Sequence, residues 1–158
     1  MRSRLTFFVA LYLLAALTLT AASALLNQQL AVQTGLIRSF YPQVGFHGQP
    51  LFRDTTPDIS LAFLEEQPQL PRRFFSVRWH GFWFIPREQT IEVYAGGDDH
   101  VVVVVDGEPV LRRNASEGMH TSSRTLTLGR GPHQLTVDYE QFGGGFSMKM
   151  SYCSKRFS

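Results

Sequence analysis

Apolar and polar residues alternate with a period of two over long stretches of the second half of the chain. In residues 90–95, 135–139 and 146–152, apolar side chains occupy every second position. This period places successive side chains on opposite faces of a β-strand, so each segment predicts a strand with one buried face. The five valines at 101–105 are apolar on both faces, and they predict a strand that is covered on both sides.

Turn residues separate these segments. Asp106-Gly107 follows the valines, and an Asp-Gly pair between apolar runs is a strong signal for a hairpin. The sequence GRGP at 129–132 predicts a second hairpin, and three glycines at 143–145 join the last two strands. After residue 34 the only short helical candidate is residues 59–67, which lie between two prolines. The pattern therefore predicts an all-β fold, an antiparallel sandwich or barrel.

An apolar segment, residues 5–26, precedes this β-rich part and contains no charged side chain. A helix needs about 20 apolar residues to span a bilayer, so the segment predicts a transmembrane helix. Arg2 and Arg4 precede it and favour a cytoplasmic N-terminus, so we expect a signal anchor with the remainder outside the cytoplasm. The alternative is a signal peptide cleaved after ASA at 22–24, which would give a secreted or periplasmic product.

Composition narrows the classes of partner. The chain has 158 residues, of which 44% are hydrophobic, and a formal net charge of +2 at pH 7, which suits one domain with a packed core. The basic residues are scattered rather than gathered in a stripe, so we expect no nucleic-acid partner. Cys153 is the single cysteine, so no internal disulfide can stabilise the fold.

Several ordered motifs in the β-rich part resemble one known family. Residues 75–81 are FSVRWHG, and Pro86, the pair Asp98-Asp99 and the Asp106-Gly107 turn follow in that order. This order and spacing resemble the PA14 domain, a β-sandwich first described in protective antigen, the anthrax toxin component. The resemblance implies that the strands form a sandwich rather than a barrel.

The resemblance covers nearly the whole of the chain after the apolar segment. GLIRSFY at 35–41 with RDTTPDI at 53–59 is similar to the family's opening strand and its Arg-x-x-x-Pro-x-Ile element, and residues 126–152 are similar to its closing strands and glycine loop. The expected organisation is a signal anchor or signal peptide at 1–26, a connector at 27–34, a PA14-like antiparallel β-sandwich at 35–153 and a short tail at 154–158.

The resemblance also implies a function, because PA14 domains usually serve as non-catalytic binding modules in glycosidases, glycosyltransferases, adhesins and toxins. In the adhesin lectins of the family, the paired aspartates of the loop hold a calcium ion that bridges to sugar hydroxyls. Calcium takes six to eight oxygen ligands, and neighbouring carboxylates supply several of them. Asp98 and Asp99 are therefore candidate metal and ligand residues. The alternative is a solvated loop in which they cap backbone N–H groups.

Three positions depart from the family pattern. His100 stands where many members have glycine, and Gly97 stands where many have serine. Arg112-Arg113 stands where an Asp-Asn pair is common. Guanidinium groups that reached the loop would pair with Asp98 or Asp99 and compete with a cation. The sequence leaves open whether the acidic pair binds calcium or forms a salt-bridged corner.

Further candidates for ligand contact are His100, Asn114 and Trp83. His100 adjoins the acidic pair, with a role at the end of a strand as the alternative, because no second His or Cys stands at the spacing of a zinc site. Asn114 begins an Asn-x-Ser glycosylation sequon and is a candidate to face a ligand. Trp83 or Phe82 is the expected exposed aromatic platform, whereas Trp79 belongs to the family's core motif and is expected inside.

No sequence motif of a catalytic nucleophile, a phosphate-binding loop or a metalloprotease is present, so we expect no enzyme. The expected protein is a membrane-anchored, extracytoplasmic module that binds carbohydrate or a cell-surface glycan, with calcium as the candidate cofactor. The alternative is a structural or interaction domain without a small ligand. Such a domain would be an accessory to a membrane glycosyltransferase or to another cell-envelope protein.

Overall fold

The computed structural model describes residues 18, 35–114 and 121–154. Residues Gly35–Ser158 form one compact unit. The predicted anchor or signal peptide, apart from Thr18, the connector at 27–34 and the tail beyond Ser154 lie outside the described residues. Within the part that is described, no helix is long and apolar enough to cross a membrane.

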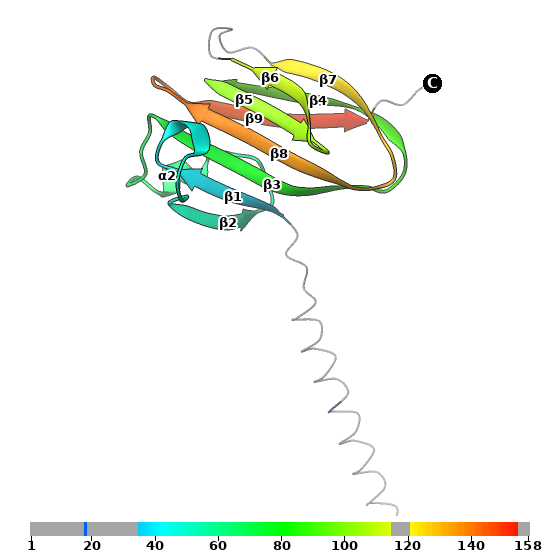
Figure 1. Cartoon of the computed structure of the whole chain (residues 1–158), viewed down its shortest axis with the longest axis horizontal. Helices are drawn as coiled ribbons and strands as arrows, with labels where there is room; N and C mark the ends of the chain where they lie inside the picture. Colours follow the sequence, from blue (N-terminus) through cyan, green and yellow to red (C-terminus); the bar gives the residue numbers. More distant parts are fainter. Residues whose placement is uncertain (1–17, 19–34, 115–120, 155–158) are drawn as a thin grey trace, which may run out of the picture. The chain divides into compact units, whose positions relative to one another are not determined.

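The described part of this unit consists almost entirely of strands in two antiparallel sheets (Figure 1). The six-stranded sheet has the order β2-β1-β3-β8-β5-β6, and the three-stranded sheet has the order β7-β4-β9. The strands are β1 (Leu36–Tyr41), β2 (Phe52–Thr56), β3 (Phe75–Ile85), β4 (Gln89–Asp98), β5 (His100–Val105), β6 (Glu108–Arg113), β7 (Ser122–Leu128), β8 (Gly131–Gln141) and β9 (Ser147–Ser154). The predicted all-β antiparallel fold is confirmed.

The hydrophobic core is built from the alternating positions that the sequence pattern singled out. The apolar residues of β4 and β8 are buried, and the polar residues between them are partly exposed. They pack into one cluster with β3 and β5, in which Trp79 is fully buried. Burial of apolar surface at about 25 cal/mol per Å² is the main favourable term that holds the two sheets together. The expected place of Trp79 inside is thus confirmed.

A short helix, α2 (Phe63–Glu66), packs against β1 and β2, and it falls within the predicted helical candidate at 59–67. Its Phe63 contacts the rings of Phe40 and Phe52. The Arg38 guanidinium lies 3.9 Å from the centre of the Phe63 ring and donates hydrogen bonds from Nε and Nη2 to both carboxylate oxygens of Asp54. The ion pair allows a buried arginine to serve as part of this apolar cover.

The turn at 129–132 does not form the predicted hairpin. β7, which precedes the turn, pairs with β4 in the three-stranded sheet, whereas β8, which follows it, pairs with β3 and β5 in the six-stranded sheet. The chain therefore crosses from one sheet to the other at this turn. A glycine- and proline-rich turn marks a change of direction, but it does not fix which strands pair across it.

The valine strand β5 is covered on one face only, so the prediction of cover on both faces is wrong. Val102 and Val104 are half-buried, and they alternate with the buried Val101, Val103 and Val105. The three-stranded sheet packs against one face of the six-stranded sheet, and Val102 stands on the other face between Asp138 and Arg112 of the neighbouring strands. Valine also suits the exposed face of a strand because of its β-branched side chain.

The predicted hairpin at Asp106-Gly107 joins β5 to β6. Both residues have positive φ, 51° for Asp106 and 83° for Gly107, as a two-residue type I′ turn requires. The Asp106 carboxylate also accepts hydrogen bonds from the Gln134 N–H at 2.8 Å and from His133 Nδ1 at 2.6 Å. The hydrogen bond from His133 lowers the pKa of Asp106, and that same bond raises the pKa of His133.

We expect Asp106→Asn to reduce stability in a pH-dependent way, because the amide keeps an acceptor for Gln134 but removes the charge. Since the pKa of His133 is raised, its stabilising charge is fully present below about pH 6.5 and is lost as the pH rises through the folded-state pKa. Since the pKa of Asp106 is lowered, the stabilisation that its negative charge contributes is lost only at strongly acidic pH. Thermal melts should show a Tm deficit of about 1–3 °C at pH 5.5 that disappears by pH 9. An equal deficit at both pH values would contradict the ion pair.

Candidate functional site

The acidic pair lies where the chain passes from one sheet to the other. Asp98 is the last residue of β4, Asp99 follows it, and both side chains are half-buried. The peptide bond between them is cis. A Cβ on the preceding Gly97 would lie 2.6 Å from Val101 Cγ2 and 3.0 Å from the Ser147 carbonyl oxygen. Such close approach requires glycine at this position, which accounts for the absence of the serine that many family members have.

Two buried polar residues of β8 support this corner from inside. The Tyr139 hydroxyl hydrogen-bonds to the carbonyl oxygen of Asp98 and to Oε1 of Gln141. The Gln141 amide nitrogen donates to the carbonyl oxygens of Gly143 at 2.7 Å and Gly145 at 2.8 Å. Both side chains are 0% exposed, and their bonds join the corner to the glycine loop. The single proton of the Tyr139 hydroxyl is shared between two acceptors, and the network fixes the corner relative to the glycine loop.

Asp99 fixes the same glycine loop from the outside. Its Oδ2 accepts hydrogen bonds from the N–H groups of Phe142 at 2.6 Å and Gly143 at 3.3 Å. One carboxylate oxygen of Asp99 therefore has a structural role, which was the alternative interpretation of the pair. The other oxygen accepts no hydrogen bond from a backbone N–H group among the described residues.

The Asp99 carboxylate is close enough to Asp98 to perturb it. Burial raises the pKa of Asp98, and the hydrogen bond and charge of Asp99 raise it further. Burial also raises the pKa of the Tyr139 hydroxyl, with a smaller contribution from the charges of Asp99 and Asp98. Neighbouring like charges that disfavour each other are relieved by a proton or by a cation. The corner therefore has the electrostatics of a cation-binding site.

The two arginines of β6 have different positions. Arg112 is exposed, and Arg113 is 1% exposed, with Nε donating to the Gly97 carbonyl oxygen at 3.4 Å. Arg113 lowers the pKa of Asp98, but less than burial and Asp99 raise it. Within the described residues, neither arginine forms an ion pair with the acidic pair. The salt-bridged corner considered from the sequence is not formed there.

The remaining predicted residues at this end are not gathered around the acidic pair. His100 begins β5, and its Nδ1 lies 2.9 Å from Oε2 of Glu140, while its Nε2 is buried without a partner among the described residues. His100 stands directly opposite Glu140 on β8. Asn114 follows β6 and is exposed, but the other two positions of its sequon lie outside the described residues.

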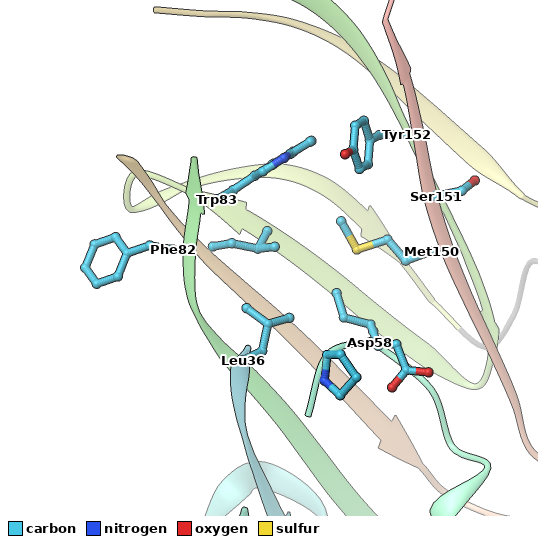
Figure 2. A pocket seen from close by; sticks show the side chains of 10 residues that line it. Leu36, Asp58, Phe82, Trp83, Met150, Ser151 and Tyr152 are labelled. Carbon is cyan, nitrogen blue, oxygen red and sulfur yellow. The ribbon is translucent and has the colours of Figure 1, made fainter. Parts of the chain in front are cut away.

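Trp83 belongs to a different part of the molecule. It lines a pocket of about 350 Å³ together with Tyr152, Met150 and Leu36. Figure 2 shows its ring beside that of Tyr152, with Phe82 pointing the other way from the same strand. Phe82 is 70% exposed. The sequence predicted an exposed aromatic platform at Trp83 or Phe82, and the two side chains lie on opposite faces of β3.

A metal site with three protein side chains is absent from the described residues. No three His, Cys, Asp or Glu side chains there lie close enough to share an ion. Calcium at the acidic corner would take oxygens from two carboxylates and complete its shell with ligand or water oxygens.

The comparisons with known proteins identify the family. The family model of the PA14 domain matches residues 32–157. The chain belongs to the PA14 domain family. The resemblance inferred from residues 75–107 is thereby confirmed. A search of curated proteins gives no match.

Solved structures share the fold of this PA14 domain. An anti-sigma factor domain-containing protein has a TM-score of 0.67 and 24% identity, and the match covers 77% of this chain and 43% of that one. The PA14 sugar-binding domain from an RTX adhesin has a TM-score of 0.58 and 18% identity, and the match covers 77% of this chain and 90% of that one. The PA14 domain of the MpAFP antifreeze protein has a TM-score of 0.62 and 12% identity, covering 77% and 82%. This chain thus spans less than half of the first of these proteins.

Several residues that matter in this PA14 domain were not found from the sequence. Tyr139 and Gln141 occur in an ordinary alternating strand, and Gln141 is the polar member of a buried face. The sequence predicted a strand at Tyr152 but gave no contact for its ring. The centroid of that ring lies 4.5 Å from the centroid of the Trp83 ring. The one sequence signal for the network of Tyr139 and Gln141 is a glutamine at a position on the buried face of a strand. Glutamine is rarely buried without hydrogen-bond partners.

We expect Gln141→Leu to destabilise the domain by about 2–4 kcal/mol, because the Gly143 and Gly145 carbonyls and the Tyr139 hydroxyl would lose a buried partner. Chemical denaturation measures the change. Gln134→Leu is the matched control, since Gln134 lies on the same strand with an exposed side chain. A similar, small effect of both substitutions would show that the network does not support the corner.

Proposed function

We propose that this PA14 domain is a non-catalytic carbohydrate-binding module whose ligand contacts the acidic corner at Asp98 and Asp99. The observation that carries the proposal is the pair of adjacent carboxylates at one corner. Asp99 binds the glycine loop, the Asp98 carbonyl contacts Tyr139, and burial together with Asp99 raises the pKa of Asp98. The family and its structural neighbour, the PA14 sugar-binding domain from an RTX adhesin, support the choice of ligand class.

The residues present suit calcium better than any softer metal, because all available donors are oxygens. Asp98 offers its carboxylate, and Asp99 offers the oxygen that does not accept backbone N–H groups. Calcium, when bound, supplies a positive charge to which two neighbouring sugar hydroxyls can bind. The role of the chain is to hold the two carboxylates in place. Asn114 is exposed after β6, and we include it as a ligand contact.

His100 is left out of the proposed contacts. Its Nδ1 pairs with Glu140, and its Nε2 is a buried atom, so neither nitrogen is accessible to a sugar. A histidine in this arrangement fastens the start of β5 to β8.

The proposal of a binding function rather than a catalytic one also rests on the arrangement of the acids. Asp98 and Asp99 are adjacent in one loop, whereas glycoside hydrolysis uses two carboxyl groups on opposite sides of a bound sugar, about 5–10 Å apart. Adjacent carboxylates on a rigid corner can bind an ion or hydroxyl groups, but they cannot act on the two faces of one glycosidic bond.

A second candidate function is an interaction domain without a small ligand. Phe82 is 70% exposed and Phe84 is 63% exposed, and both side chains lie on the face of β3 opposite to Trp83. Exposed aromatic side chains close together are typical of protein interfaces. This second candidate function is favoured if the experiments below detect neither a calcium response nor glycan binding.

We expect calcium to stabilise the purified full chain, by about 2.7 kcal/mol at a concentration 100-fold above Kd. Binding to a glycan array should include a calcium-dependent component that is lost in EDTA. Because the folded-state pKa of Asp98 is raised, its ionised form disfavours folding at pH 7. Asp98→Asn should therefore raise Tm slightly in EDTA and abolish the calcium response. The excess Tm should shrink as the pH falls towards 3.

Asp99→Asn should also abolish the calcium response, while Glu108→Gln, an exposed acid on β6, should retain it. A calcium response that survives both Asp substitutions would place the ion elsewhere. No calcium response together with no glycan binding would reject the proposed function.

We further propose that the apolar segment at 5–26 anchors the chain with the PA14 domain outside the cytoplasm, supported by its length and by Arg2 and Arg4 before it. The protein should remain in the membrane pellet after a high-salt wash, and its mature form should begin upstream of residue 22. Mass spectrometry of the N-terminus measures this directly. A mature N-terminus after residue 24 in a soluble fraction would instead establish a cleaved signal peptide.

A further inference from the structure

The pocket beside Trp83 is distant from the acidic corner. Asp98 stands opposite Ser147 at the start of β9, whereas Tyr152 stands further along the same strand, opposite Val93. At about 3.3 Å per residue, the five steps from residue 147 to residue 152 correspond to roughly 16 Å. The pocket is therefore a separate place for a ligand, with a volume of about 350 Å³, within the usual range of small-molecule sites.

Two aromatic rings form one wall of the pocket. The rings of Trp83 and Tyr152 have centroids 4.5 Å apart and planes inclined at 63°, so they touch each other and form one angled surface (Figure 2). No group fits between them, which distinguishes the pair from a cage around a cation. Tyr152 is 57% exposed, although a large aromatic ring gains free energy when it is covered.

The remaining walls combine apolar and polar groups. Leu36 and Met150 contribute the apolar part, and Asp58 contributes a carboxylate. Oδ1 of Asp58 accepts a hydrogen bond from the Thr56 hydroxyl at 2.9 Å. Its second carboxylate oxygen has no partner within the described residues, so the carboxylate can accept a further hydrogen bond.

We propose that this pocket is a second carbohydrate site, which binds a pyranose ring without a metal ion. The C–H face of a sugar such as β-glucose or β-galactose is apolar and would cover the Trp83–Tyr152 surface, while its hydroxyl edge would donate to Asp58. An apolar chain would cover the rings but would make no hydrogen bond to the Asp58 carboxylate. The proposal takes its ligand class from the proposed function, but it uses different residues.

Tryptophan fluorescence tests the proposal directly. The chain has two tryptophans, and Trp79 is fully buried, so a ligand in the pocket should change the emission of Trp83 alone. The full chain is titrated in EDTA with cellohexaose, galactohexaose and mannohexaose. We expect a saturable change with at least one of the first two sugars. No change with any of the three would overturn the proposal.

Variants locate the binding. Tyr152→Ala and Asp58→Ala should each weaken EDTA-resistant binding about tenfold, a loss that corresponds to one good aromatic or charged contact. Trp83→Ala should remove the fluorescence response, with calorimetry in place of fluorescence for that variant. If Trp83→Ala does not fold, the first two variants decide the question. Phe84→Ala is the matched control, because Phe84 lies one position away on β3 with its side chain on the opposite face.

Binding measured with calcium and with EDTA, in variants of each site, separates this pocket from the acidic corner. Asp98→Asn should abolish any calcium-dependent glycan binding and leave the EDTA-resistant binding intact. Tyr152→Ala should weaken the EDTA-resistant binding and leave the calcium-dependent glycan binding intact. EDTA-resistant binding that is lost in Asp98→Asn, or retained in Tyr152→Ala and Asp58→Ala together, would overturn the second site without bearing on the first.

Discussion

The hydrogen bond between the Tyr139 hydroxyl and the Asp98 carbonyl oxygen joins the two sheets at one end of the sandwich. Tyr139 belongs to the six-stranded sheet, and Asp98 ends a strand of the three-stranded sheet. Gln141 continues the connection to the carbonyls of the glycine loop. Because these groups are buried, breaking one bond leaves the others without partners, so the corner is rigid as a unit. The position of the acidic pair depends on this network.

Rigidity explains how two like charges persist side by side. In a mobile loop, Asp98 and Asp99 would move apart, and Asp99 would no longer raise the pKa of Asp98. Here Asp99 is fixed by two backbone N–H groups, and Asp98 is fixed through its own carbonyl. The raised pKa of Asp98 shows that the domain tolerates this repulsion. Perturbed pKa values of this kind cluster at functional sites.

The two candidate surfaces differ in the physics by which they can bind. The acidic corner offers charge and hydrogen-bond acceptors on a fixed frame, and its ligands must exchange with water and ions. The pocket at Trp83 and Tyr152 offers apolar area, and its ligands must displace water from aromatic surface. Because the two lie at different positions along β9, the two proposed sites would let one chain contact a polysaccharide at two points. Two weak contacts on one polymer strengthen binding through effective concentration.

The residues alone determined the all-β class, because alternation in β4, β8 and β9 dictates which faces are buried, and the motifs around residues 75–107 identified the family. They also placed the Asp106-Gly107 hairpin, since that turn is a local property of two residues with positive φ. Only the tertiary structure decided that the turn at 129–132 crosses between sheets, that Arg113 is buried under Gly97 and that Tyr152 meets Trp83. Each of these depends on pairing between strands distant in sequence. Alternation fixes the face of a side chain, but it carries no information about which strand lies opposite.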